Sequence, residues 1–130
     1  MARLLAMLAS AVVALAGCGE GETGAARDTG RSEVRITVDP DGGGPDEAST
    51  RTVECGTTGR LRECEFLAGV PLDAFDPVPP GTACTQVFGG PQTARVTGSL
   101  RGERVDAAFA RSNGCEISRW ERIAALLGRG

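Results

Sequence analysis

Four cysteines set the strongest constraint on how this chain can fold: Cys55, Cys64, Cys84 and Cys115. In a small domain outside the reducing cytosol, four cysteines predict two disulfides, for which three pairings exist. The sequential pairing, Cys55 with Cys64 and Cys84 with Cys115, is the simplest of the three. In the chain-entropy description these bridges would stabilise the fold by about 3 and about 4 kcal/mol. They matter because the only aromatic residues available for a core are four Phe and one Trp.

Metal binding is the other common use of such cysteines, and the sequence disfavours it. No cysteine pair has the two-residue spacing of a zinc knuckle, and the chain contains no His. The acidic, glycine-rich segment 39–50 suggests calcium instead, but it departs from the EF-hand template because position 12 is Thr50 rather than Glu. A solvated turn is the better interpretation, and we expect neither a metal nor a cofactor.

The ionisable residues narrow the classes of function. The chain has no His, no Tyr and no Lys, so all 14 basic residues are Arg. The net charge of the chain is -3, and removal of a leader that contains Arg3 would make it -4. Nucleic-acid binding needs clustered positive charge, so this composition argues against it. The usual proton shuttles are missing, and neither a Gly-x-Ser-x-Gly motif nor a nucleotide-binding loop is present. We therefore expect a protein that is not an enzyme and does not bind nucleic acid.

An export segment opens the sequence. Arg3 precedes an apolar run over residues 4–15, which is too short to span a bilayer and has the right length for a signal-peptide core. The run leads into Leu15-Ala16-Gly17-Cys18, which resembles the lipobox of bacterial lipoproteins. We expect cleavage after residue 17 and a lipid on Cys18, followed by a flexible tether over 18–32. The protein would then be exported and held at the outer face of the cell membrane; with a plain secretory signal it would be secreted instead.

Residues 33–130 are enough for one domain. Apolar residues alternate in four segments, 33–38, 50–55, 94–100 and 104–110, and each alternation predicts a half-buried strand. The second strand is expected to return beside the first. Between the last two strands, Arg101-Gly102 predicts a tight hairpin with Gly102 at positive φ.

Helical patterns occupy the other segments. Residues 62–69 predict a short helix that ends at Gly69, residues 72–75 another turn, and the proline-rich segment 76–81 a rigid loop. Near the end, Ser118-x-x-Glu121 has the form of a capping box. Apolar residues then recur at helical spacing and predict a C-terminal helix on the sheet: Trp120, Ile123, Ala124 and Leu127.

One segment, 81–91, stands apart from these elements. It runs between two proline- and glycine-rich breakers and would be tied at Cys84 by a long-range disulfide. Val87 and Phe88 lie just before Gly89-Gly90-Pro91, where neither a helix nor a core strand is expected. Two interpretations stay open: these apolar side chains tuck inward, or a braced loop presents an extended peptide outward.

Several short motifs occur in a characteristic order. Two Cys pairs are accompanied by Cys-x-x-Leu from Cys64, by Cys-Thr-x-Val-aromatic from Cys84, and by Val-x-Gly-x-x-x-Gly-x-x-Val from Val96. The series ends with Ser112-Asn113-x-Cys115-Glu116. Together these motifs make residues 33–120 resemble the bacterial subtilisin inhibitor-like proteins, which are secreted inhibitors of serine proteases. The resemblance implies an α+β fold with about five antiparallel strands and two helices, and homodimers formed through the sheet.

The resemblance also implies which residues act. In that family the residue two positions after the third cysteine precedes the scissile bond, which here gives the bond Gln86–Val87. Asn113 occupies the position of an Asn that supports the loop from behind. The other residues of the implied reactive loop flank the bond: Cys84, Thr85, Phe88 and Gly89. The implied partner is a serine protease, subtilisin-like rather than trypsin-like, blocked by a disulfide-braced, substrate-like loop.

The sequence departs from that family in four places. Gln86 is neither a large apolar residue nor Arg or Lys, and Gly89-Gly90-Pro91 makes the loop one residue longer. The first disulfide loop is shorter, and the chain after Glu116 has a different, helical sequence. The alternative function is therefore a surface-anchored lipoprotein module of the same fold that binds a protein without inhibiting a protease.

Overall fold

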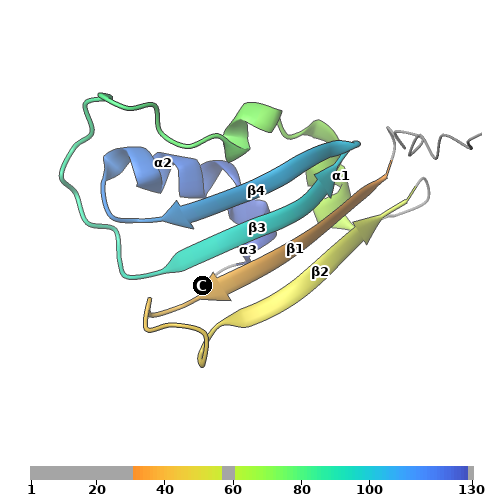
Figure 1. Cartoon of the computed structure of the whole chain (residues 1–130), viewed down its shortest axis with the longest axis horizontal. Coiled ribbons are helices and arrows are strands. Elements are labelled where there is room, and N and C mark those ends of the chain that lie inside the picture. Colours follow the sequence, from red (N-terminus) through yellow and green to blue (C-terminus); the bar gives the residue numbers. More distant parts are fainter. Residues whose placement is uncertain (1–30, 57–60, 129–130) are drawn as a thin grey trace, which may run out of the picture.

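The structure is a computed structural model that describes residues 31–56 and 61–128 (Figure 1). The predicted signal peptide and Cys18 lie outside the described residues. Within the described ranges, no helix combines the length and the apolar character needed to cross a membrane. The elements in chain order are β1 (Ser32–Asp39), β2 (Ser49–Cys55), α1 (Arg62–Gly69), the 3-10 helix η1 (Leu72–Phe75), β3 (Thr93–Leu100), β4 (Glu103–Ala110), α2 (Gly114–Arg122) and α3 (Ala124–Leu127).

The strands form one antiparallel sheet in the order β2-β1-β3-β4. All four strands expected from the alternating apolar residues are present, and β2 returns beside β1 as predicted. The fifth strand implied by the family resemblance is absent from the described residues, so that expectation was wrong. The long segment between η1 and β3 is the obvious place for it, but Pro77, Pro79 and Pro80 remove the backbone donors that a strand needs.

The β3–β4 hairpin turns on two residues with positive φ, Arg101 at 49° and Gly102 at 82°. This geometry matches the right-handed twist of the strands, and Arg is an unusual residue for its first position. Its side chain explains the choice. The guanidinium donates to the carbonyl oxygens of Leu67 and, at 2.8 Å, of Val70, at the carboxyl end of α1. The hairpin is thereby fastened to the helix.

The helices lie on one face of the sheet, and the core fills the space between them (Figure 1). Val34 and Ile36 of β1 point into this core, as do Val96 and Phe109, while alternate residues of the strands face solvent. The fold class is α+β, as predicted. The sheet therefore takes its buried side chains from positions that the alternation in the sequence assigned.

The C-terminal helix differs from its prediction. It begins at Gly114 rather than near Ser118, because Asn113 is the N-cap residue and its side-chain oxygen accepts the Glu116 N–H at 3.0 Å. The helix also breaks at Ile123, whose φ of -115° and ψ of 12° are not helical. The break divides it into α2 and α3, and α3 directs Leu126 rather than Ala124 into the core.

Both disulfides have the sequential pairing. Cys55 joins Cys64 with a Cα–Cα distance of 5.5 Å, and Cys84 joins Cys115 with 5.3 Å. The first bridge is part of the core and connects the end of β2 to α1. The second connects the long loop before β3 to the first turn of α2.

Candidate functional site

Residues 76–92 connect η1 to β3 without any helix or strand. In Figure 1 this segment runs outward past the amino end of α2 and turns back to enter the sheet at β3. A tight turn shapes its first part, where Thr82 donates to the Pro79 carbonyl oxygen through both its N–H, at 3.2 Å, and its hydroxyl, at 2.6 Å. The next residues then reach α2.

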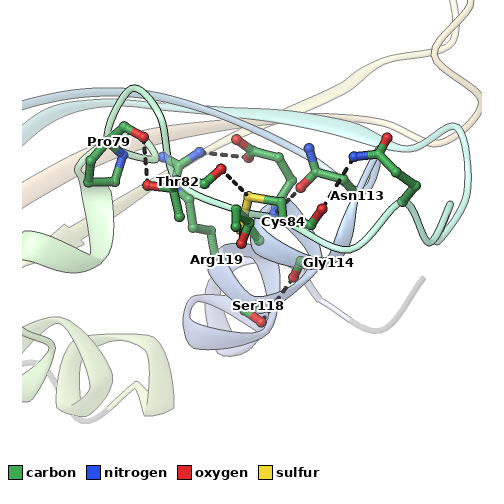
Figure 2. The surroundings of a disulfide bond; sticks show 11 residues. Pro79, Thr82, Cys84, Asn113, Gly114, Ser118 and Arg119 are labelled. Carbon is green, nitrogen blue, oxygen red and sulfur yellow. Dashed lines mark hydrogen bonds and ion pairs between the residues drawn. A yellow bond between two sulfur atoms is a disulfide. The ribbon is translucent and has the colours of Figure 1, made fainter.

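On its amino side the loop is attached to the start of α2 at Cys84 and Thr85, and we call Thr85 the amino foot. Cys84 is bonded to Cys115, and the next carbonyl, of Thr85, accepts the Gly114 N–H at 2.9 Å. Figure 2 shows Cys84 beside Asn113 and Gly114 at the start of α2. The two chains are so close that a Cβ at Gly114 would overlap the Thr85 hydroxyl. A covalent bond, a hydrogen bond and close packing therefore fix one side of the loop.

The loop meets the protein again at Gly89, the carboxyl foot. The Gly89 N–H donates to the Arg111 carbonyl oxygen at 2.7 Å. A Cβ at Gly89 would lie 2.8 Å from the side chain of Ile117, so the backbone here packs directly on α2. Arg111 is itself positioned by Trp120, because its guanidinium carbon lies 5.9 Å from the centre of the Trp120 ring.

The three residues between the two feet, Gln86, Val87 and Phe88, form an exposed arch. Val87 is 58% exposed and Phe88 is 69% exposed, the largest value among the exposed large apolar residues of the described chain. Of the two interpretations of these side chains, the inward one is therefore wrong. The Gln86 side chain folds back along the loop, where its amide nitrogen donates to the Cys84 carbonyl oxygen at 3.2 Å.

Beneath the arch, α2 is tied to β4 by the side chain of Arg119. Arg119 pairs with Glu116 at 2.8 Å and donates to the Ala108 carbonyl oxygen of β4 at 3.1 Å. Its guanidinium carbon also lies 4.6 Å from the centre of the Phe109 ring, within the range of a cation–π contact. The Arg119–Glu116 pair lies within α2, and the hydrogen bond to Ala108 and the contact with Phe109 attach the helix to the sheet.

Most of the residues expected from the sequence lie together here, and some contacts were not foreseen. Asn113 is beside the amino foot, where its side-chain oxygen caps α2 and the neighbouring Gly114 makes the hydrogen bond to the loop. Its role as a loop support stays a prediction. The contacts of Gly114 and Arg111 with the loop were missed, because they use backbone atoms and no side-chain pattern in the sequence reports them.

An acidic turn lies at the same end of the sheet, where β1 ends. The Asp39 carboxylate accepts the N–H groups of Gly44 at 2.9 Å, Gly42 at 2.8 Å and Asp41 at 3.2 Å. These donors, the Gly44 N–H first among them, hold the pKa of Asp39 below its usual value. The carboxylate organises the turn, and the part of the chain that the structure describes has no cluster of three or more His, Cys, Asp or Glu suited to a metal.

Scans against protein-family models, curated proteins and solved structures returned no match for this chain.

Proposed function

We propose that this protein is an inhibitor of serine endopeptidases that blocks the protease cleft with the arch around Gln86–Val87, as in the subtilisin inhibitor-like proteins that its sequence motifs resemble. One observation carries the proposal: residues 86–88 are exposed while both of their neighbours are held, by a disulfide and by backbone hydrogen bonds. An exposed peptide that is held on both sides in this way has the form of a protease substrate.

The fixed feet explain why such a peptide would inhibit. A loop that already has its bound conformation loses little conformational entropy on docking, so more of the contact energy remains as affinity. If the protease cuts Gln86–Val87, the disulfide and the Gly114 hydrogen bond hold the new carboxyl end, and the Arg111 hydrogen bond holds the new amino end. Religation then competes with release of the cut protein.

Titration of the purified protein against a panel of subtilisin-like and trypsin-like proteases tests the proposal. We expect stoichiometric loss of activity for at least one serine protease, and stronger inhibition of subtilisin-like than of trypsin-like enzymes. Mass analysis of the mixture should find any cut at Gln86–Val87. Undiminished activity across the panel, or rapid cleavage at other bonds of the loop, would contradict the proposal.

The second candidate is a binding module of the same fold without inhibitory activity. It is favoured by the position of the two exposed apolar residues, Val87 and Phe88, which both lie after Gln86. A partner that contacts only Val87 and Phe88 would need no pocket for the Gln86 side chain. Phe88→Ala should then abolish partner binding while Gln86→Ala leaves it unchanged, whereas inhibition should depend on both residues.

We further propose that the inhibitor acts at the outer face of the cell membrane, attached through a lipid on Cys18. The support is the lipobox-like sequence before Cys18 and the glycine-rich tether after it. Cell fractionation and mass analysis of the mature amino terminus test this. Protein found only in the culture fluid, with residues still preceding Cys18, would contradict the anchor.

A further inference from the structure

The carboxyl side of the arch continues past Gly89 to Pro91, where it meets a second part of the molecule. The turn after β1, residues 39–44, lies against Pro91: a Cβ at Gly42 would be 2.6 Å from the Pro91 carbonyl oxygen. The backbone of this turn is therefore in close contact with the backbone of the loop. This contact lies outside α2, which holds both feet.

The shape of the turn depends on one side chain. Asp39 accepts three backbone N–H groups and is itself buried at the end of β1. Gly42 and Gly44 both have positive φ, 70° and 118°, so the turn has a conformation that other residues adopt only with strain. The carboxylate supplies the hydrogen bonds that keep the chain in this path.

A pocket lies beside the turn. An open pocket of about 730 Å³ lies at this end of the sheet and is bordered by Asp39, Gly44, Thr93 and Asn113. It therefore separates the Asp39 turn from the capped start of α2. The carboxyl side of the loop passes from Gly89, packed on α2, to Pro91, packed on the turn.

We propose that Asp39 is a positioning residue for the candidate reactive loop, and that the turn it organises supports the carboxyl side of the arch through the contact of Gly42 with Pro91. The proposal rests on the proposed function only in calling the loop reactive. The loop would thus be held by α2 and a disulfide on its amino side, and by α2 and the Asp39 turn on its carboxyl side.

Amide hydrogen exchange of the purified protein, followed by NMR, tests this without any protease. The reporter is the Gly89 N–H, and the internal references are the Gly114 N–H of the amino foot and the Val96 N–H of the sheet. Gly42→Ala introduces the clash with Pro91. Gly44→Ala is the reference for backbone strain without the clash, because Gly44 also has a positive φ but its Cβ would meet no atom within 4 Å.

Asp39→Asn is the second variant. Its control is Asp46→Asn, which removes a negative charge from the segment between β1 and β2. We expect Gly42→Ala and Asp39→Asn to raise the exchange rate of Gly89 by about tenfold, the equivalent of one weakened hydrogen bond. Gly114 and Val96 should keep their rates, Asp46→Asn should resemble the wild type, and Gly44→Ala should raise the Gly89 exchange rate less than Gly42→Ala does. A purely structural role for the turn would instead raise the exchange of all three amides together.

The proposal is overturned if Gly89 exchange is unchanged in Asp39→Asn, or if Gly44→Ala raises it as much as Gly42→Ala does. Should Gly42→Ala fail to fold, Asp39→Asn with its control decides. A protein that passes this test and inhibits no protease would refute the proposed function while leaving the support intact. The two failures are therefore distinguishable.

Discussion

The two disulfides of this protein have the same chemistry and different surroundings. Cys55 and Cys64 are 5% and 6% exposed and belong to the core, where they join β2 to α1. Cys84 and Cys115 are only partly buried and join an irregular loop to the first turn of α2. The first bridge links two elements that also pack on each other, whereas the second links α2 to a segment with no helix or strand of its own.

The difference shows that a disulfide acts through what it restrains. At the first bridge, loss of the bond would leave the apolar packing of β2 and α1 to hold the same residues together. At the second, the fixed residues lead directly into an arch whose side chains face solvent. The first bridge therefore acts on the fold alone, whereas the second also fixes the shape of the candidate site.

Removal of each disulfide gives the largest expected effects and tests this division directly. Replacing both Cys84 and Cys115 by Ala should lower the free energy of unfolding by about 4 kcal/mol, and replacing both Cys55 and Cys64 by about 3 kcal/mol, because of the lengths of the loops they close. Only the loss of Cys84–Cys115 should turn the arch into an ordinary substrate. Urea unfolding and the cleavage rate at Gln86–Val87, measured where both variants are folded, provide the check. Equal acceleration of cleavage in the two variants would remove the distinction.

A change within the arch should alter binding and leave the fold intact. In an apolar protease pocket the Gln86 amide would lose hydrogen bonds, at a cost of about 1–3 kcal/mol. Gln86→Leu or Gln86→Met removes that cost, so the affinity for subtilisin-like enzymes should rise by about 10- to 100-fold. Gln86→Arg should instead favour trypsin-like enzymes. Inhibition constants and thermal unfolding measure the two effects separately, and well-folded variants that inhibit nothing would favour the non-inhibitory module.

A smaller effect is expected at Asn113, which connects the braced loop to the folded core through the start of α2. Asn113→Ala removes the N-cap hydrogen bond to Glu116 and should lower the free energy of unfolding by about 1 kcal/mol. Asn113→Asp keeps a capping oxygen and should restore most of that stability. If Asn113 also supports the arch through its amide group, both the alanine and the aspartate variants should be cleaved faster at Gln86–Val87. Unchanged cleavage of the aspartate variant would limit Asn113 to capping.

The smallest effect is a pH dependence at the Asp39 turn, far from both disulfides in the sequence. Because the N–H donors of Gly44, Asp41 and Gly42 lower the pKa of Asp39 in the folded state, its contribution to stability is present above the usual pKa of an Asp. This contribution should be lost as the pH falls through the lowered pKa of Asp39. Urea unfolding of wild type and Asp39→Asn should give stabilities that differ at pH 6 and converge near pH 2. A difference independent of pH would contradict this.

The sequence predicted the strands because alternating apolar residues such as Val34 and Ile36 report directly on burial. It predicted both disulfides because the sequential pairing is the simplest of the three. It also located the arch, since Gly89-Gly90-Pro91 excludes regular structure there. The start of α2 was missed because Asn113-x-x-Glu116 and Ser118-x-x-Glu121 both have the form of a cap, and Ser118 instead donates back to the Gly114 carbonyl oxygen. The contact of Arg111 with the loop uses a backbone carbonyl, which leaves no mark on residue type. The contact of Gly42 requires a glycine, but the sequence does not distinguish it from Gly43 and Gly44 beside it.

The most direct measurement of the central claim is the equilibrium between intact and cut protein in the presence of a protease that it inhibits. Samples that begin either intact or already cut at Gln86–Val87 are incubated with catalytic amounts of the enzyme and followed by mass analysis. If the feet at Thr85 and Gly89 hold the ends together, both samples should converge on one mixture in which intact protein persists, and the cut protein should still inhibit. Complete conversion of the intact sample to cut protein, with loss of inhibition, would contradict the account.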